Sequence, residues 1–172
     1  LLSVDNITIT VTYTPAVSSQ TITFGALSNK TYGDTDFTVS ATASSGLTVS
    51  FASQTTGVCT TSGTNGATVH IVLAGTCTVR ASQAGNGSYS AAPNVDQSFT
   101  VNKATPTLSI TNSPVTYNGS AQSASVSGSV AGTVSDVKYG GSSTVPTGAG
   151  TYAVTADFTP NDTVNYNTLN DA

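Results

Sequence analysis

The sequence of 172 residues contains no tryptophan, methionine or glutamate, and only four of its residues are lysine or arginine. Charged residues make up 7% of the chain, against roughly 25% in ordinary soluble domains. Four cations are too few to neutralise a phosphate backbone, which argues against nucleic acid as a partner. No apolar run approaches the roughly 18 residues of a membrane span, so we expect no membrane insertion.

The chain is rich in hydroxyl-bearing residues instead of charged ones. Serine and threonine make up about a third of the chain. Threonine favours strands, and neither residue favours helix interiors. A surface solvated by hydroxyls, with a net charge of −4, favours an extracellular location over a cytosolic one. Residue 1 is a leucine with no positively charged segment after it, so we expect a mature fragment or a piece of something longer.

The residue types that carry most enzyme chemistry are also scarce. The single histidine, His70, lies between Val69 and Ile71 on an expected strand, and therefore faces solvent or a sheet edge. We find no Ser-His-acid or Cys-His arrangement with the required context. Asp34 and Asp36 supply too few oxygens for calcium and indicate a turn instead. The sequence therefore predicts no catalytic residue, no cofactor and no metal site.

Cys59 and Cys77 are the two cysteines. An even number of cysteines in a lysine-poor, threonine-rich chain predicts a disulfide in an oxidising compartment. Two free, buried thiols are the alternative. A metal site needs more ligands than this pair provides.

The clearest strand pattern lies at the start of the chain. Ile7, Ile9, Val11 and Tyr13 alternate with threonines, which predicts a strand over residues 4–14 with one apolar face. Pro15 ends it.

Further strand patterns divide the rest of the chain at residue 103. Alternation over residues 37–43 predicts one strand, and Val69, Ile71 and Leu73 are expected to point inward on another. Phe99 and Val101 predict a strand that closes the first domain. Lys103, Ala104, Thr105 and Pro106 then form a stiff joint, because Pro106 fixes its own φ and favours an extended Thr105.

Several motifs occur in both parts. The stretch 74–81 (AGTCTVRA) recurs as 149–156 (AGTYAVTA), and Thr31-Tyr32-Gly33 recurs as Thr116-Tyr117-Asn118-Gly119. Relative to these motifs, Tyr166 in the second part occupies the position that Tyr89 occupies in the first. Tyrosines at matched places predict packing at the ends of each domain. Many short strands without a helical period predict two small β-sandwiches.

The repeat also exposes a gap. Tyr89 is followed ten residues later by Phe99 and its closing strand, whereas Tyr166 is followed by six residues. Residues 4–14 would restore the pattern if the end of one copy continued into the start of the next. We therefore expect this strand to complete the second-type domain of a preceding repeat or subunit.

These residues also carry a family resemblance. The stretches 20–24 (QTITF), 30–34 (KTYGD) and 37–47 (FTVSATASSGL), with Cys59 and Cys77, resemble bacterial Ig-like repeats of giant secreted surface proteins. The stretches 116–119 (TYNG) and 146–156 (PTGAGTYAVTA) resemble the related MBG-type repeats. The resemblance implies tandem Ig-like sandwiches that serve as a stalk, adhesin or filament segment, without catalytic residues.

The sequence thus predicts an all-β chain of three parts: a strand and linker (1–19), an Ig-like sandwich (20–103) and an MBG-type sandwich lacking its last strand (104–172). The leading hypothesis is a structural repeat unit of an extracellular bacterial surface fibre or stalk, with other copies of itself as partners. It leaves open whether the copies form a covalent array or a polymer. An adhesin module that binds an unknown glycan or protein ligand is the alternative, and an accessory domain of a secreted enzyme is a third.

Overall fold

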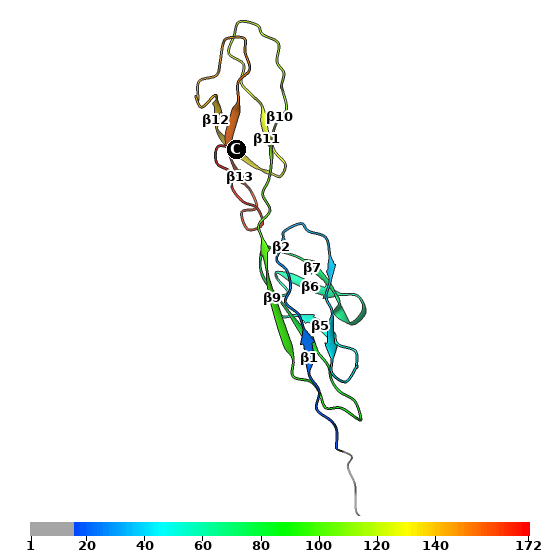
Figure 1. Cartoon of the computed structure of the whole chain (residues 1–172). Coiled ribbons are helices and arrows are strands. Elements are labelled where there is room, and N and C mark those ends of the chain that lie inside the picture. Colours follow the sequence, from blue (N-terminus) through cyan, green and yellow to red (C-terminus); the bar gives the residue numbers. More distant parts are fainter. Residues whose placement is uncertain (1–15) are drawn as a thin grey trace, which may run out of the picture.

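The computed structural model describes residues 16–172 and is built from β-strands, as the sequence predicts. Two strand-rich parts stand end to end, here called the N-lobe (residues 16–103) and the C-lobe (residues 104–172) (Figure 1). The first described segment of the chain, in dark blue, lies at the end of the N-lobe that faces away from the C-lobe. The strand expected at 4–14, with Ile7, Ile9, Val11 and Tyr13, lies outside the described residues.

The N-lobe contains nine strands and one 3-10 turn. They are β1 (Ile22–Phe24), β2 (Lys30–Thr31), β3 (Phe37–Thr38), β4 (Ala41–Ala43), β5 (Ser50–Ser53), β6 (Cys59–Ser62), η1 (Thr64–Gly66), β7 (Thr68–Ile71), β8 (Gly75–Ser82) and β9 (Val95–Asn102). The largest sheet has the order β2-β9-β8-β5, the second has the order β3-β7-β6, and β1 pairs with β4.

A single core of fifteen buried residues joins these three sheets. Its centre is the β8–β9 pair, in which Cys77 lies opposite Phe99 and Gly75 opposite Val101. Phe99 and Val101 are buried, as their alternation predicts, while Thr100 between them is exposed. The Phe99 ring meets the Phe37 ring edge-on at 5.5 Å, a geometry that aromatic pairs favour.

Two expectations about the N-lobe strands are wrong. The alternation over residues 37–43 is divided between two strands, because β3 pairs with β7 while β4 pairs with β1 in another sheet. Alternation alone cannot show where a strand changes sheets. Leu73 was expected to face inward but is exposed, since β7 ends at Ile71 and the chain is already turning towards β8.

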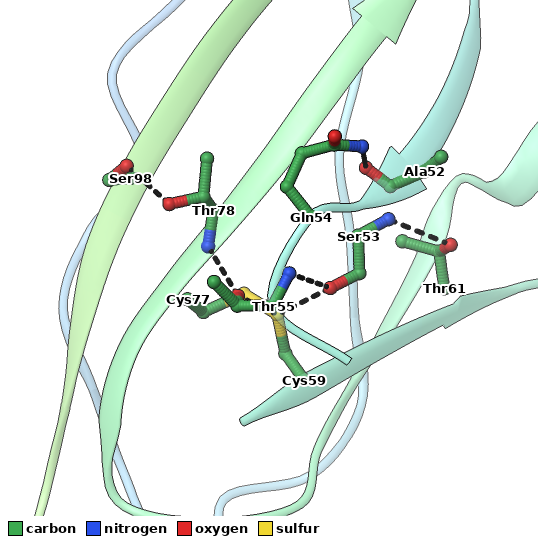
Figure 2. Close-up of a disulfide and its surroundings, with 9 residues drawn as sticks. All are labelled: Ala52, Ser53, Gln54, Thr55, Cys59, Thr61, Cys77, Thr78 and Ser98. Atoms are coloured by element: carbon green, nitrogen blue, oxygen red, sulfur yellow. Dashed lines mark hydrogen bonds between the residues drawn. A yellow bond between two sulfur atoms is a disulfide. The ribbon is translucent and has the colours of Figure 1, made fainter. Parts of the chain in front are cut away.

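A disulfide joins Cys59 on β6 to Cys77 on β8, and so ties two sheets of the N-lobe together (Figure 2). Both cysteines are fully buried. Two hydrogen bonds lie beside them. The Thr78 amide donates to Oγ1 of Thr55 at 2.9 Å, and the Thr55 amide donates to Oγ of Ser53 at 3.1 Å. These bonds satisfy the backbone beside the buried sulfurs.

The C-lobe has fewer strands. They are β10 (Leu108–Ile110), β11 (Val126–Gly128), β12 (Gly132–Tyr139) and β13 (Val154–Pro160). They form two separate pairs, β10–β11 and β12–β13. The tail 169–172 continues alongside β13: Leu169 and Phe158 exchange backbone hydrogen bonds at 2.9 Å, and Ala172 and Ala156 do so at 3.1 Å.

Phe158 is the centre of the small C-lobe core and is 1% exposed. Gly128 on β11 and Gly132 on β12 lie against its ring, where a β-carbon at either position would overlap the aromatic carbons. Tyr139 is also buried, and its hydroxyl accepts a hydrogen bond from the Ala124 amide at 2.7 Å. The two glycines therefore let the β10–β11 sheet approach the β12–β13 sheet.

We expect reduction of the Cys59–Cys77 disulfide to lower the unfolding free energy of the N-lobe by about 3 kcal/mol, because the bond closes a short loop in the unfolded chain. Denaturant titration with and without reductant measures the change, and the C-lobe transition serves as an internal control. The same N-lobe midpoint in both conditions would contradict the role assigned to this bond.

We expect Gly128→Ala to destabilise the C-lobe by about 1–3 kcal/mol through overpacking against Phe158. Gly119→Ala is not a suitable control, because Gly119 has a positive φ. Gly87→Ala is suitable, since no atom lies within 4 Å of the added carbon. Thermal unfolding of the two variants makes the comparison, and equal melting temperatures would contradict the packing described.

Candidate functional site

The predicted joint residues connect the lobes through the backbone. Ala104 forms a parallel bridge with Tyr166: its amide donates to the Asn165 carbonyl at 2.8 Å, and its carbonyl accepts from the Asn167 amide at 2.9 Å. Pro106 is buried, and the Lys103 ammonium donates to the Thr163 carbonyl at 2.6 Å. The chain therefore leaves β9 and is fixed against the C-lobe within a few residues.

Asn165 forms the central polar contact of the joint. Its side chain is on the C-lobe, yet its Oδ1 accepts a hydrogen bond at 2.8 Å from the amide of Ala74, in the N-lobe turn before β8. Its Nδ2 donates to Oδ2 of Asp162 at 2.8 Å. Asn165 is 3% exposed. The role of Asn165 could not be predicted from the sequence, because an asparagine in a loop gives no signal of a partner 91 positions away.

Asp162 holds the Asn165 loop in place. Its carboxylate accepts hydrogen bonds from the Asn165 side chain, from the Asn165 amide and from the Val164 amide, and these bonds keep the pKa of Asp162 below its usual value. Lys103 contributes weakly in the same direction.

An aromatic pair completes the joint. The ring of Tyr32, on the N-lobe, meets the ring of Tyr166, on the C-lobe, at 5.5 Å and an angle of 84°. Both tyrosines are half-buried, in agreement with the packing predicted for tyrosines at the lobe ends. Tyr117, at the matched position of the C-lobe, differs from that prediction, because it is 61% exposed.

A long groove runs along the C-lobe; it is mainly apolar between β10 and β13 and of mixed polarity further on. One part lies between β10 and β13 and is lined by Leu108, Val126 and Leu169; the next part is lined by Val115 and Tyr152. The two parts share Ile110 and Val154 and are therefore continuous. Ile110, Val115 and Tyr152 are among the most exposed large apolar residues of the part of the chain that the structure describes.

The N-lobe has a strand where the C-lobe has this groove. In the N-lobe, β9 lies between β2 and β8. By the sequence repeat, β2 corresponds to residues 115–116 and Val79 on β8 corresponds to Val154 on β13. Val79 pairs with Gln97 of β9. Within residues 16–172, β13 pairs on that side with the tail alone, at Ala156 and Phe158.

The backbone of Val154 points into the groove. The Gly140 amide donates to the Ala153 carbonyl at 2.7 Å, so the neighbouring Tyr139–Val154 pair is of the non-hydrogen-bonded kind. The N–H and C=O of Val154 therefore face away from β12, on the side where Ala156 bonds to Ala172. This edge is suited to accept a further antiparallel strand.

The remaining polar groups considered from the sequence are held in ordinary pairs. Nδ1 of His70 lies 2.7 Å from Oδ1 of Asp36, and both side chains are more than half exposed. Near the tail, Asp136, Asp157 and Asp171 come together, but the Lys138 ammonium lies 2.8 Å from Asp136 and 2.6 Å from Asp171. The two carboxylates raise the pKa of Lys138, Asp136 more than Asp171. This cluster attaches the tail to β12.

Comparison with family models gives one match within the C-lobe. Residues 104–168 match the MBG domain, which confirms the resemblance noted for this half of the chain. The C-lobe is thus similar to the MBG domain, an all-β repeat domain of a kind that occurs in surface proteins. A search of curated proteins and a search of solved structures each return no match to the chain.

Residues 16–172 include no helix with the length and apolarity needed to cross a lipid bilayer.

We expect the joint to loosen in acid. Because the folded pKa of Asp162 is lowered, its stabilisation is complete above the unfolded pKa of roughly 4 and is lost as the pH falls through the folded pKa. Small-angle scattering at pH 7 and pH 3 reports the order between the lobes, with circular dichroism to confirm intact strands.

Asp162→Asn should remove this pH dependence, since the amide does not titrate. Asp157→Asn is the matched control, because Asp157 also accepts a hydrogen bond from a backbone amide, that of Asp171 in the C-lobe tail. The account of the joint fails if scattering from the unmodified protein is the same at both pH values while its strands remain intact.

Proposed function

We propose that this chain is a structural repeat unit of an extracellular bacterial surface fibre or stalk, in which copies follow one another head to tail. The MBG match supports a repeat domain of a surface protein. The end-to-end lobes support an extended unit, since the first described segment and the C-lobe lie at opposite ends of the molecule (Figure 1). Contacts at opposite ends generate open, non-closing assemblies.

In this proposal the lobes correspond to two Ig-like sandwiches, residues 20–103 and 104–172, of which the first is complete. The shared core of the N-lobe has fifteen buried members. In the C-lobe, the buried apolar residues are Tyr139, Ala156, Phe158 and two prolines, Pro106 and Pro160. The observation that carries the proposal is this difference in core size between two lobes of similar sequence. The small C-lobe core leaves apolar side chains exposed on one side of that lobe.

We propose that residues 4–14 of the following copy fill the groove of the C-lobe, as β9 fills the equivalent place in the N-lobe. β9 inserts Phe99 and Val101 and leaves Thr100 and Asn102 in solvent. The sequence at 4–14 offers the same alternation, with Ile9 and Val11 on one face and threonines on the other. An added strand of this kind pairs its backbone with the open edge and places alternate side chains in the core.

The start of the N-lobe supports this assignment. Ser18 bridges to Tyr89 in parallel, as Ala104 bridges to Tyr166. The bonds also match: the Ser18 amide donates to the Ser88 carbonyl at 2.9 Å, and the Ser90 amide donates to the Ser18 carbonyl at 2.9 Å. Since the residues before Ala104 are the closing strand of a preceding lobe, the residues before Ser18 are expected to serve the same role. In both a covalent array and a polymer of subunits, residues 4–14 would lie in the groove of the preceding C-lobe.

We expect the full chain to self-associate in solution through this strand, and Ile9→Asp with Val11→Asp to weaken association at least 100-fold, because two carboxylates would enter an apolar groove. Thr8→Asp with Thr10→Asp is the matched control: it adds the same charge to the same strand on the opposite face. Sedimentation and electron microscopy measure the assemblies.

Equal loss of assembly in both variants would point to charge repulsion, and equal retention would remove strand insertion from the account. The alternative of an adhesin module rests on the exposed Val115 and Tyr117 of the C-lobe. A chain that remains monomeric at all concentrations and binds a surface glycan or protein would favour that alternative.

A further inference from the structure

We propose that the Tyr117 end of the C-lobe docks against the Tyr89 loop of the following copy, with a second Tyr–Tyr ring pair at the contact. This inference rests on the proposed head-to-tail assembly and deepens it, since it names a surface outside the groove. The partner is a second copy of this chain.

The joint between the lobes supplies the template. Tyr32 follows β2 directly, and its amide donates to the carbonyl of Asn102 at the end of β9 at 2.9 Å. Tyr166 lies beside Ala104, two residues after β9. The closing strand therefore ends between the two tyrosines and brings their rings into contact at 5.5 Å.

The two tyrosine positions of the joint each occur a second time in the chain, at opposite ends of the molecule. Tyr117 matches Tyr32 in the repeated Thr-Tyr turn, and Tyr89 matches Tyr166 in its parallel bridge. Tyr117 is 61% exposed, the highest value among the large apolar side chains of the described residues. Tyr89 is half-buried, as Tyr166 is.

The chain geometry brings the two ends together. Residues 4–14 end four positions before Ser18, and Ser18 is fixed to Tyr89 by the same backbone bonds that fix Ala104 to Tyr166. A strand seated in the C-lobe groove as β9 is seated in the N-lobe would end beside Tyr117. It would therefore carry Tyr89 of its own N-lobe to that ring.

The polar part of the template is only partly repeated. Asn86 caps the Tyr89 loop, since its Oδ1 accepts from the amides of Ser88 and Tyr89 at 2.8 and 3.0 Å, much as Asp162 caps the Asn165 loop. Ser88 stands where Asn165 does and is too short to reproduce its bond to the facing lobe. The contact between copies should therefore have the ring pair without the asparagine bridge, and be looser than the joint within a chain.

Photo-oxidative dityrosine cross-linking of the assembled full chain tests this proposal, because it links tyrosine rings that touch. Mass spectrometry of the digest should identify a Tyr32–Tyr166 link within the chain, as the internal positive control, and a Tyr89–Tyr117 link between copies. Mixing isotopically light and heavy chains should show that the second link joins different molecules. Tyr117→Phe should abolish the link while leaving assembly intact.

Tyr117→Ala should weaken association by roughly three- to tenfold, the range expected for loss of one aromatic pair, and Tyr117→Phe should restore it. Val72→Ala is the matched control, because Val72 is an exposed apolar residue in the N-lobe turn that precedes β8, away from the Tyr89 loop.

The outcomes separate the two proposals. If assemblies form and give the Tyr32–Tyr166 link without the Tyr89–Tyr117 link, the docking surface is overturned and strand insertion stands. If the full chain forms no assembly at any concentration, the head-to-tail function is overturned and the docking surface with it.

Discussion

The exposed edge of β13 is the constraint on which the organisation of the C-lobe depends. A strand edge carries unpaired N–H and C=O groups, and water or another strand must satisfy them. In the N-lobe, β9 covers the matching edge of β8 over its length and contributes Phe99 and Val101 to the core. Within residues 16–172, the corresponding edge of β13 is covered by the tail only at Ala156 and Phe158. One unpaired edge thus accounts for both the apolar groove and the small core.

The joint between the lobes shows how a chain so poor in charge builds a defined connection. Its contacts are one aromatic pair, one buried asparagine, one lysine bonded to a carbonyl and a few backbone bonds, supported by a carboxylate that itself accepts hydrogen bonds. Such short-range bonds depend less on salt than a network of surface ion pairs would. A stiff joint within each unit and a looser contact between units would give an extended assembly regularly spaced points of bending.

Sequence patterns predicted those parts of the fold that depend on local alternation and on repetition. They identified the all-β class, the buried Phe99 and Val101, and the resemblance of the C-lobe to the MBG domain. They did not show that the chain changes sheets between β3 and β4, because both short strands keep the same alternation. Sequence patterns also did not predict the role of Asn165 or the exposure of Tyr117. Both depend on whether another lobe packs against that end of the C-lobe. Contacts across a joint leave no periodic signal in the sequence.

Hydrogen exchange at the Val154 amide tests the central claim most directly. In the monomeric Ile9→Asp, Val11→Asp chain this amide faces the open groove and should exchange rapidly, whereas the Ala156 amide, bonded to Ala172, should be protected. In assemblies of the unmodified chain the account predicts that Val154 becomes as protected as Ala156. An amide at Val154 that exchanges equally fast in monomer and assembly would contradict strand insertion into the C-lobe.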